Sequence, residues 1–229
     1  MDPIPNSEKS KNPFKVQINV DALNEWYSNT INSTADETRK ETKLRSGFAV
    51  ALHSSSLPSE NDKEWALSIN DDFLDSLKVY LTANYTDSHG PSGTIYALLD
   101  FQKSFNEKGL NFEFTKKSSE VAGLLKSMGY EAEFEKDGLV NEIKVRGLSD
   151  NREIVITMGA DNFEDAKELE LIPEDVGDYG MQIAINDLSI DKDKFVADLK
   201  IFAEVFSAFV NSVYQVQGKR APEKKLVLG

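Results

Sequence analysis

The feature that most constrains the fold is an apolar stretch near the C-terminus. Between residues 190 and 217, large apolar side chains recur every three or four positions, the spacing that puts them on one side of an α-helix. This stripe consists of Phe195, Leu199, Phe202, Phe206, Phe209, Val213 and Val216, and it is widened by Val196, Ile201, Val205, Ala208, Val210 and Ser212. Each large side chain left in water would forgo about 1.5–3 kcal/mol of burial free energy. Their sum rivals the roughly 5–15 kcal/mol that stabilises a whole domain, so the helix must be buried.

Two arrangements would bury this helix, which we expect to begin after Ser189 and to end at Gly218. It can lie across a sheet as the central helix of the chain. Alternatively, one side packs on the sheet and another side contacts a second copy, which makes the protein a homo-oligomer. The residues offered for that interface are Phe195, Phe202, Phe206 and Phe209. The stretch is only about three to four heptads long, so its spacing does not separate the two arrangements.

Alternation of apolar and polar residues predicts strands over 14–20, 47–53, 65–69, 110–114, 130–135, 139–146, 153–158 and 181–185. Asp137-Gly138 is a strong hairpin signal, and a second turn is expected at residues 149–151, so the strands between about 130 and 158 form a meander. The strands at 47–53 and 65–69 are expected to form a hairpin with a long loop. The fold class is therefore α+β: a mixed, mostly antiparallel sheet covered by helices, with a long amphipathic C-terminal helix.

Four further helices are expected from capping residues and apolar spacing. One starts at Asp21, one at Asn70, and one at Thr94 that ends at Gly109. The helix after Asn70 carries Phe73, Leu74, Leu77, Tyr80 and Leu81, and the helix after Thr94 carries Ile95, Leu98, Leu99 and Phe105. The fourth is capped by Ser118 or Ser119 and ends at Gly129.

The expected organisation is one domain with two short extensions. Residues 1–12 are polar and contain prolines, as is typical of a flexible arm. Residues 13–217 form a single α+β domain, with two lobes joined near 85–93 as the alternative. Residues 218–229 form a C-terminal tail that is basic and then apolar.

Composition narrows the function classes. The formal net charge of the 229 residues is −13, which repels nucleic acid and anionic membranes and favours a basic protein partner. The absence of cysteine excludes disulfides, thiolate nucleophiles and Cys-ligated metals.

The sequence has neither an N-terminal signal-like apolar run nor a segment of about 20 apolar residues, so a soluble, cytoplasmic protein is expected. Export by a route that needs no signal peptide stays open.

The most acidic part of the chain is residues 161–178, with eight acidic residues and one lysine. It lacks the ligand spacing of an EF-hand, so it is expected to be a solvated face or a docking surface for a basic protein. The residues proposed to bind the partner are Asp161, Glu164, Asp165, Glu168, Glu170, Glu174 and Asp175.

Candidate chemistry is sparse. Asp87, Ser88 and His89 belong to a glycine-containing loop before the helix expected at Thr94, and such a helix N-terminus can bind an anion. The loop lacks the lysine of a phosphate-binding P-loop, so a plain interhelical connection is the alternative. His53 lies beside three serines without an orienting third group, and Asp71, Asp72 and Asp75 suit the start of a helix. No metal site or cofactor is expected.

The leading hypothesis is a non-catalytic interaction protein: an inhibitor, an immunity-type protein, a chaperone or an assembly factor. It would bind a protein partner through an acidic surface. One alternative is a small enzyme or ligand-binding protein with an anion site at residues 85–94. Another is a homo-oligomeric structural component.

Overall fold

The computed structural model describes residues 13–28, 46–48, 65–67, 76–86, 90–100, 114–137, 140–160, 181–189 and 191–228. Its main element is an eight-stranded antiparallel sheet with the strand order β2-β4-β5-β9-β8-β7-β6, to which β3 adds beside β4. The strands are β2 (Ser46–Phe48), β3 (Trp65–Leu67), β4 (Ser76–Thr86), β5 (Gly90–Asp100), β6 (Glu131–Asp137), β7 (Val140–Arg146), β8 (Ile154–Ala160) and β9 (Met181–Ile185). The α+β class is confirmed.

The meander β6–β7–β8 is present as predicted. Asp137 pairs with Val140, which leaves a two-residue connection between β6 and β7, and the register shifts after Val140 in the pairing with β8. The second turn is a short 3-10 helix, η3 (Ser149–Asn151). Asp150 and Asn151 have φ values of 58° and 57° there, a left-handed conformation that Asp and Asn adopt more readily than most residues.

The predictions of helices after Asn70 and at Thr94 are wrong, because these segments contain β4 and β5. The two strands pair from Ser76 with Asp100 to Thr86 with Gly90, across the place where a lobe seam was considered. An apolar run that fits a helical stripe also fits an alternating strand when every second residue is apolar. Here the alternating set is buried: Leu77, Val79, Ile95, Ala97 and Leu99.

The hairpin expected between residues 47 and 69 is also wrong. Strands β2 and β3 do not pair with each other but follow one another along the same edge of β4. Phe48 pairs with Leu81 and Trp65 with Val79. β4 is 11 residues long, so one edge has room for both three-residue strands.

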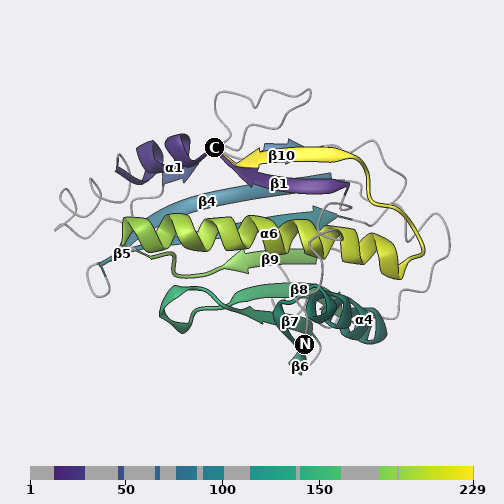
Figure 1. The fold of residues 1–229 in the computed structure, drawn as a ribbon. Helices are drawn as coiled ribbons and strands as arrows, with labels where there is room; N and C mark the ends of the chain where they lie inside the picture. The colour runs from purple at the N-terminus through teal and green to yellow at the C-terminus, as the bar shows by residue number, and fades with distance from the viewer. Residues whose placement is uncertain are drawn as a thin grey trace, which may run out of the picture.

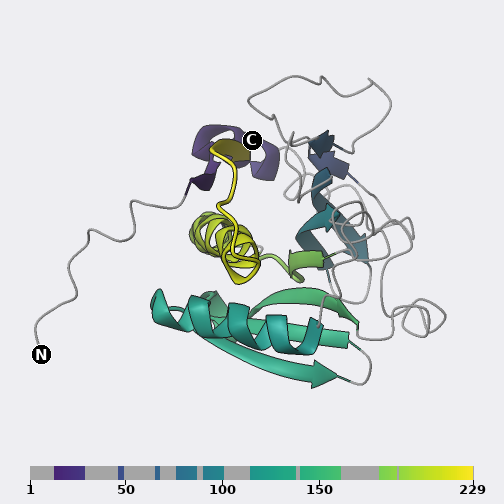
Figure 2. The ribbon, with the colours of Figure 1, turned by 90° about the vertical axis from the view of Figure 1, so that its right-hand side faces the viewer.

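The C-terminal helix α6 (Lys192–Val216) runs across the sheet, and helix α4 (Phe114–Ser127) lies beside it over β6–β8 (Figure 1). On the opposite side of α6 lie strands β1 (Phe14–Ile18) and β10 (Lys224–Leu228) and helix α1 (Val20–Tyr27). Seen nearly end-on, α6 has these elements above it, the blue strands β4 and β5 to its right, and the teal strands with α4 below it (Figure 2). The central-helix arrangement therefore describes this structure.

Burial of α6 is complete over two turns near its C-terminal end. Residues 208–214 are all buried, so no side of the helix faces water there. Phe195, Phe202, Phe206 and Phe209 are each 0% exposed within the single chain. These four side chains are consequently not accessible to a second copy in this structure, because the chain itself covers them.

Several helix boundaries differ from the predicted ones. The N-cap of α6 is Asp191 rather than Ser189: its Oδ1 accepts from the N–H groups of Asp193 and Lys194, at 3.0 and 3.1 Å. Asn19, not Asp21, caps α1. In each case two neighbouring residues have side chains able to cap a helix, and the backbone turn selects one of them.

Helix α4 also begins earlier than predicted. Phe114, expected at the end of a strand, is its first residue, while residues 110–113 lie outside the described part. Gly129 and Gly218 follow α4 and α6 as predicted, with φ values of 93° and 67° that glycine adopts at no steric cost.

The C-terminal tail is part of the fold. Residues 224–228 form β10, which pairs in parallel with β1, from Phe14 with Lys224 to Ile18 with Leu228. The opposite edge of β1 bonds to side chains of α6. The N–H of Val16 donates to the hydroxyl of Ser207 at 2.7 Å, and the amide of Asn211 donates to the carbonyl of Phe14 at 2.8 Å and accepts from its N–H at 3.4 Å.

Replacing Asn211 with alanine should lower the free energy of unfolding by about 1–3 kcal/mol, because the buried N–H and C=O of Phe14 lose their side-chain partner. Hydrogen exchange at Phe14 should accelerate more than exchange in the sheet. Ser212→Ala is the matched control: this buried hydroxyl donates to the Ala208 carbonyl of its own helix, so exchange at β1 should not change. Equal acceleration in both variants would contradict the proposed role of Asn211.

Candidate functional site

Most of the side chains singled out in the sequence lie outside the described residues. These are the acidic set from Asp161 to Asp175, the set Asp87, Ser88 and His89, the set from His53 to Ser56, and Asp71, Asp72 and Asp75. The segment that follows His89 is strand β5. An anion site at residues 85–94 would therefore lack the helix N-terminus that was expected at Thr94.

The described residues form a different charged surface, on the meander. Side chains alternate between the two faces of a strand, and one face of β6–β8 packs on α4 and α6 with buried residues such as Ala132, Ile143 and Ile156. The opposite face has five glutamates and two basic residues. We call it the glutamate face: Glu131, Glu133, Glu135, Glu142, Lys144, Arg146 and Glu153.

Strand register determines how these charges meet. Arg146 lies opposite Glu131 and forms ion pairs with Glu133 at 3.1 Å and Glu153 at 3.0 Å. Hydrogen bonding to Glu153, followed by the charge of Glu133, raises the pKa of the Arg146 guanidinium. Two carboxylates also face each other across the strands, because Glu135 lies opposite Glu142.

Lys144 is the second cation of the glutamate face. It lies opposite Glu133 and forms an ion pair with Glu135 at 2.5 Å. The hydrogen bond that Lys144 donates to Glu135 is the main cause that raises the pKa of Lys144, and the charges of nearby carboxylates add to this effect. Both cations are therefore charged at neutral pH, and each is shared by several carboxylates.

The ion pairs leave the glutamate face with an excess of negative charge. Five carboxylates surround two cations, and the side chains of Glu133 and Glu135 are 51% and 43% exposed. Such exposed pairs add little to stability, typically about 0–1 kcal/mol. Their excess charge does create a potential that attracts a basic surface. The sequence contained one signal for this face, the alternation of Glu131, Glu133 and Glu135, which the strand prediction did not use.

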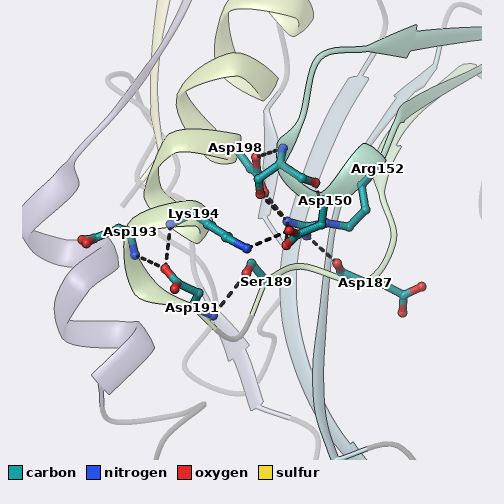
Figure 3. A network of polar contacts seen from close by, with 9 residues as sticks. Asp150, Arg152, Asp187, Ser189, Asp191, Asp193, Lys194 and Asp198 are labelled. Atoms are coloured by element: carbon teal, nitrogen blue, oxygen red, sulfur yellow. Dashed lines mark hydrogen bonds and ion pairs between the residues drawn. The ribbon is translucent and has the colours of Figure 1, made fainter.

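A second polar cluster joins α6 to the turn η3 (Figure 3). Asp198 of α6 is 1% exposed, and its Oδ1 accepts from the backbone N–H of Ser149 at 2.8 Å. Its Oδ2 accepts from the Ser149 hydroxyl at 2.8 Å and from the guanidinium of Arg152 at 2.5 Å. Arg152 also donates to the carbonyl of Asp187 at 2.6 Å.

This cluster holds α6 against η3 and shows no feature of a reactive site. Both oxygens of the buried Asp198 carboxylate accept hydrogen bonds from fixed donors, so the group has no open side for a substrate. At its exposed border Lys194 donates to Asp150 at 2.7 Å, and this hydrogen bond is the main cause that lowers the pKa of Asp150 (Figure 3). Nothing in the sequence pattern indicated these contacts, which join residues 44 to 49 positions apart.

Two further features are absent from the described ranges. Among these residues, His, Cys, Asp and Glu form no group of three or more that could hold a metal ion. Within the same ranges, no helix combines the length and apolar character needed to cross a membrane.

Comparisons with known proteins give no information on function, so a functional proposal must rest on the geometry described above. The chain matches no protein-family model, and neither the curated proteins nor the solved structures include a significant match.

Proposed function

We propose that the protein is a non-catalytic interaction factor that binds a basic protein partner in the cytoplasm. The classes that fit this proposal are an inhibitor, an immunity-type protein, a chaperone and an assembly factor. The observation that carries the proposal is the glutamate face, where five carboxylates surround two cations on an exposed surface of the sheet. The acidic residues 161–175 are a second candidate surface for the same partner.

Electrostatics supports this choice of partner. The net charge of −13 and the excess on the glutamate face both favour encounter with a positively charged protein and disfavour nucleic acid and anionic lipid. Mobile salt screens exposed charges over about 8–10 Å at 0.1–0.15 M ionic strength. Association should therefore weaken as the salt concentration rises.

The test compares two opposite changes of charge on the glutamate face. The tagged chain and a variant with Glu133→Gln, Glu135→Gln and Glu142→Gln are used to recover partners from cells that naturally produce the protein. We expect the unmodified chain to recover a basic protein in stoichiometric amount and the glutamine variant to lose it. The matched control, Lys144→Gln with Arg146→Gln, makes the same face more negative and should retain the partner.

A further variant separates the two acidic surfaces. Reversing Asp161, Glu164, Asp165 and Glu168 to lysine leaves the glutamate face intact. Loss of the partner in this variant alone would assign binding to residues 161–175. Equal recovery by every variant would contradict binding through either acidic surface.

A further inference from the structure

Strand β6 forms one border of the eight-stranded sheet (Figure 1). Within the described residues it has a strand neighbour on one side only, β7. The border of a sheet presents backbone N–H and C=O groups in the geometry that another strand needs for pairing. Charged side chains are one of the ways in which proteins control such an edge, so the side chains of β6 decide what can pair there.

The hydrogen-bonding direction along β6 follows from its turn. Two residues separate Asp137 from Val140, and the residues that flank such a turn form a hydrogen-bonded pair. Counting back in steps of two, Glu135, Glu133 and Glu131 bond to β7, so Ala132 and Phe134 direct their backbone groups to the open edge. The N–H of Ala132 agrees with this count, because it donates to the carbonyl of Tyr130 at 3.0 Å instead of to β7. The donor that the edge offers to an added strand is therefore the N–H of Phe134.

The side chains of β6 give the edge two different faces. Glu131 and Glu133 are exposed, and Glu135 is 43% exposed beside them on the glutamate face. On the other face Phe134 is only partly buried against the core. A strand added here would meet carboxylates on one face and, on the other, an aromatic ring with Lys136 at the turn end of the strand. Its side chains should therefore alternate between basic and apolar.

Charge also argues against a second copy of the chain as the added strand. Two antiparallel β6 strands would place glutamates opposite glutamates, and like charges directly opposite each other are destabilising. A basic strand has the reverse effect. Lysine or arginine opposite Glu131 and Glu133 would continue the alternation of charge that β7 begins with Arg146 and Lys144, and a third cation opposite Glu135 would offset the two facing carboxylates of Glu135 and Glu142.

We propose that the partner contributes an extended segment with alternating basic and apolar residues, which adds to the sheet as a strand beside β6. This rests on the proposed function, since it specifies how a basic partner uses the glutamate face. Main-chain hydrogen bonds to the sheet edge supply affinity in this mode of binding, and the alternating side chains supply specificity.

The experiment uses the full chain and capped seven-residue peptides. The probe alternates four lysines with three valines, a block peptide has the same composition with the lysines first, and a third peptide repeats the probe with N-methyl groups along its β6-facing edge. We expect the alternating peptide to bind about tenfold more tightly than either control, measured by fluorescence anisotropy. The loss of one or two net hydrogen bonds corresponds to a change of about this size. Exchange at the Phe134 amide should slow only with the alternating peptide.

A pair of variants tests the same contact from the protein side. Phe134→Pro and Phe134→Ala both remove the ring, but only proline removes the N–H that faces the edge, and proline is tolerated on edge strands. We expect the proline variant to bind the alternating peptide about tenfold more weakly than the alanine variant. If the proline variant does not fold, the N-methylated peptide tests the same hydrogen bonds with an unmodified protein.

The outcomes separate this inference from the proposed function. Equal affinity for all three peptides, reduced in the Glu133→Gln, Glu135→Gln, Glu142→Gln variant, would overturn strand addition and leave acidic docking in place. No binding of the alternating peptide would also overturn strand addition. If partner recovery were in addition unaffected by that variant and by the reversal at residues 161–168, the proposed function would fall with it.

Discussion

Replacing Phe206 with alanine should lower the free energy of unfolding by about 3–5 kcal/mol, the range measured when a large buried aromatic side chain is truncated. Phe206 is 0% exposed, and its ring centroid lies 6.1 Å from that of Phe14 and 5.8 Å from that of Phe202. The substitution therefore removes contacts of α6 with β1 and within α6. Urea denaturation followed by circular dichroism measures the loss.

The control for this prediction lies on the same helix. Lys200 is exposed, so Lys200→Ala should change the free energy of unfolding by no more than about 0.5 kcal/mol. The comparison separates burial from helix propensity, because both variants place alanine in the interior of α6. A loss below about 1 kcal/mol for Phe206→Ala would mean that α6 does not organise the core.

Replacing Asp198 with alanine should lower the free energy of unfolding by about 3 kcal/mol. Breaking a buried ion pair costs about 3–5 kcal/mol, and the lower end applies because Arg152 is 17% exposed and can regain some hydration. The variant also leaves the N–H and hydroxyl of Ser149 without their acceptor. Thermal and urea unfolding measure the effect.

A double-mutant cycle isolates the ion pair. Arg152→Met removes the charge that Asp198→Ala leaves uncompensated, so the double variant should be destabilised by less than the sum of the two single variants. The Ser149 amide should exchange faster whenever Asp198 is absent. Strictly additive losses would show that the Asp198–Arg152 contact contributes nothing beyond its separate parts.

The local pattern of apolar residues was sufficient to predict secondary structure where a single periodicity, helical or alternating, fits the segment. The three- and four-residue spacing of the C-terminal segment has no alternative in a strand, so both its helix and its burial follow from the side chains alone. The meander strands alternate cleanly, and Asp137-Gly138 and the Ser149–Asn151 turn use residues that suit tight turns. Gly129 and Gly218 marked the two helix ends correctly for the same reason, since both need a positive φ.

Local pattern failed where two periods fit the same residues. Leu77 with Leu81 suits a helix, and Leu77 with Val79 suits a strand. The strand is realised because β4 pairs with β5 over its whole length and β5 pairs in turn with β9, whose residues are distant in sequence. The same holds for β2 and β3, whose shared edge on β4 exists only after β4 has formed.

The candidate site also combines features that the sequence indicated with features that only the structure shows. Period-two glutamates between 131 and 135 were visible in the chain, but the position of Lys144 and Arg146 among them depends on the register with β7. The Asp198 cluster had no signal, because it joins a helix to a turn 49 positions earlier.

By itself the sequence determined which segments must leave water and where the chain turns, since hydrophobic spacing and turn chemistry act over a few residues. The tertiary structure alone decided the strand order, the parallel pairing of β10 with β1, and the gathering of five carboxylates around two cations. The pairing of β10 with β1 joins positions far apart in the chain, and its free energy arises only when packing around α6 brings the two strands together. The charges of the glutamate face meet only when the strand register of the meander is set.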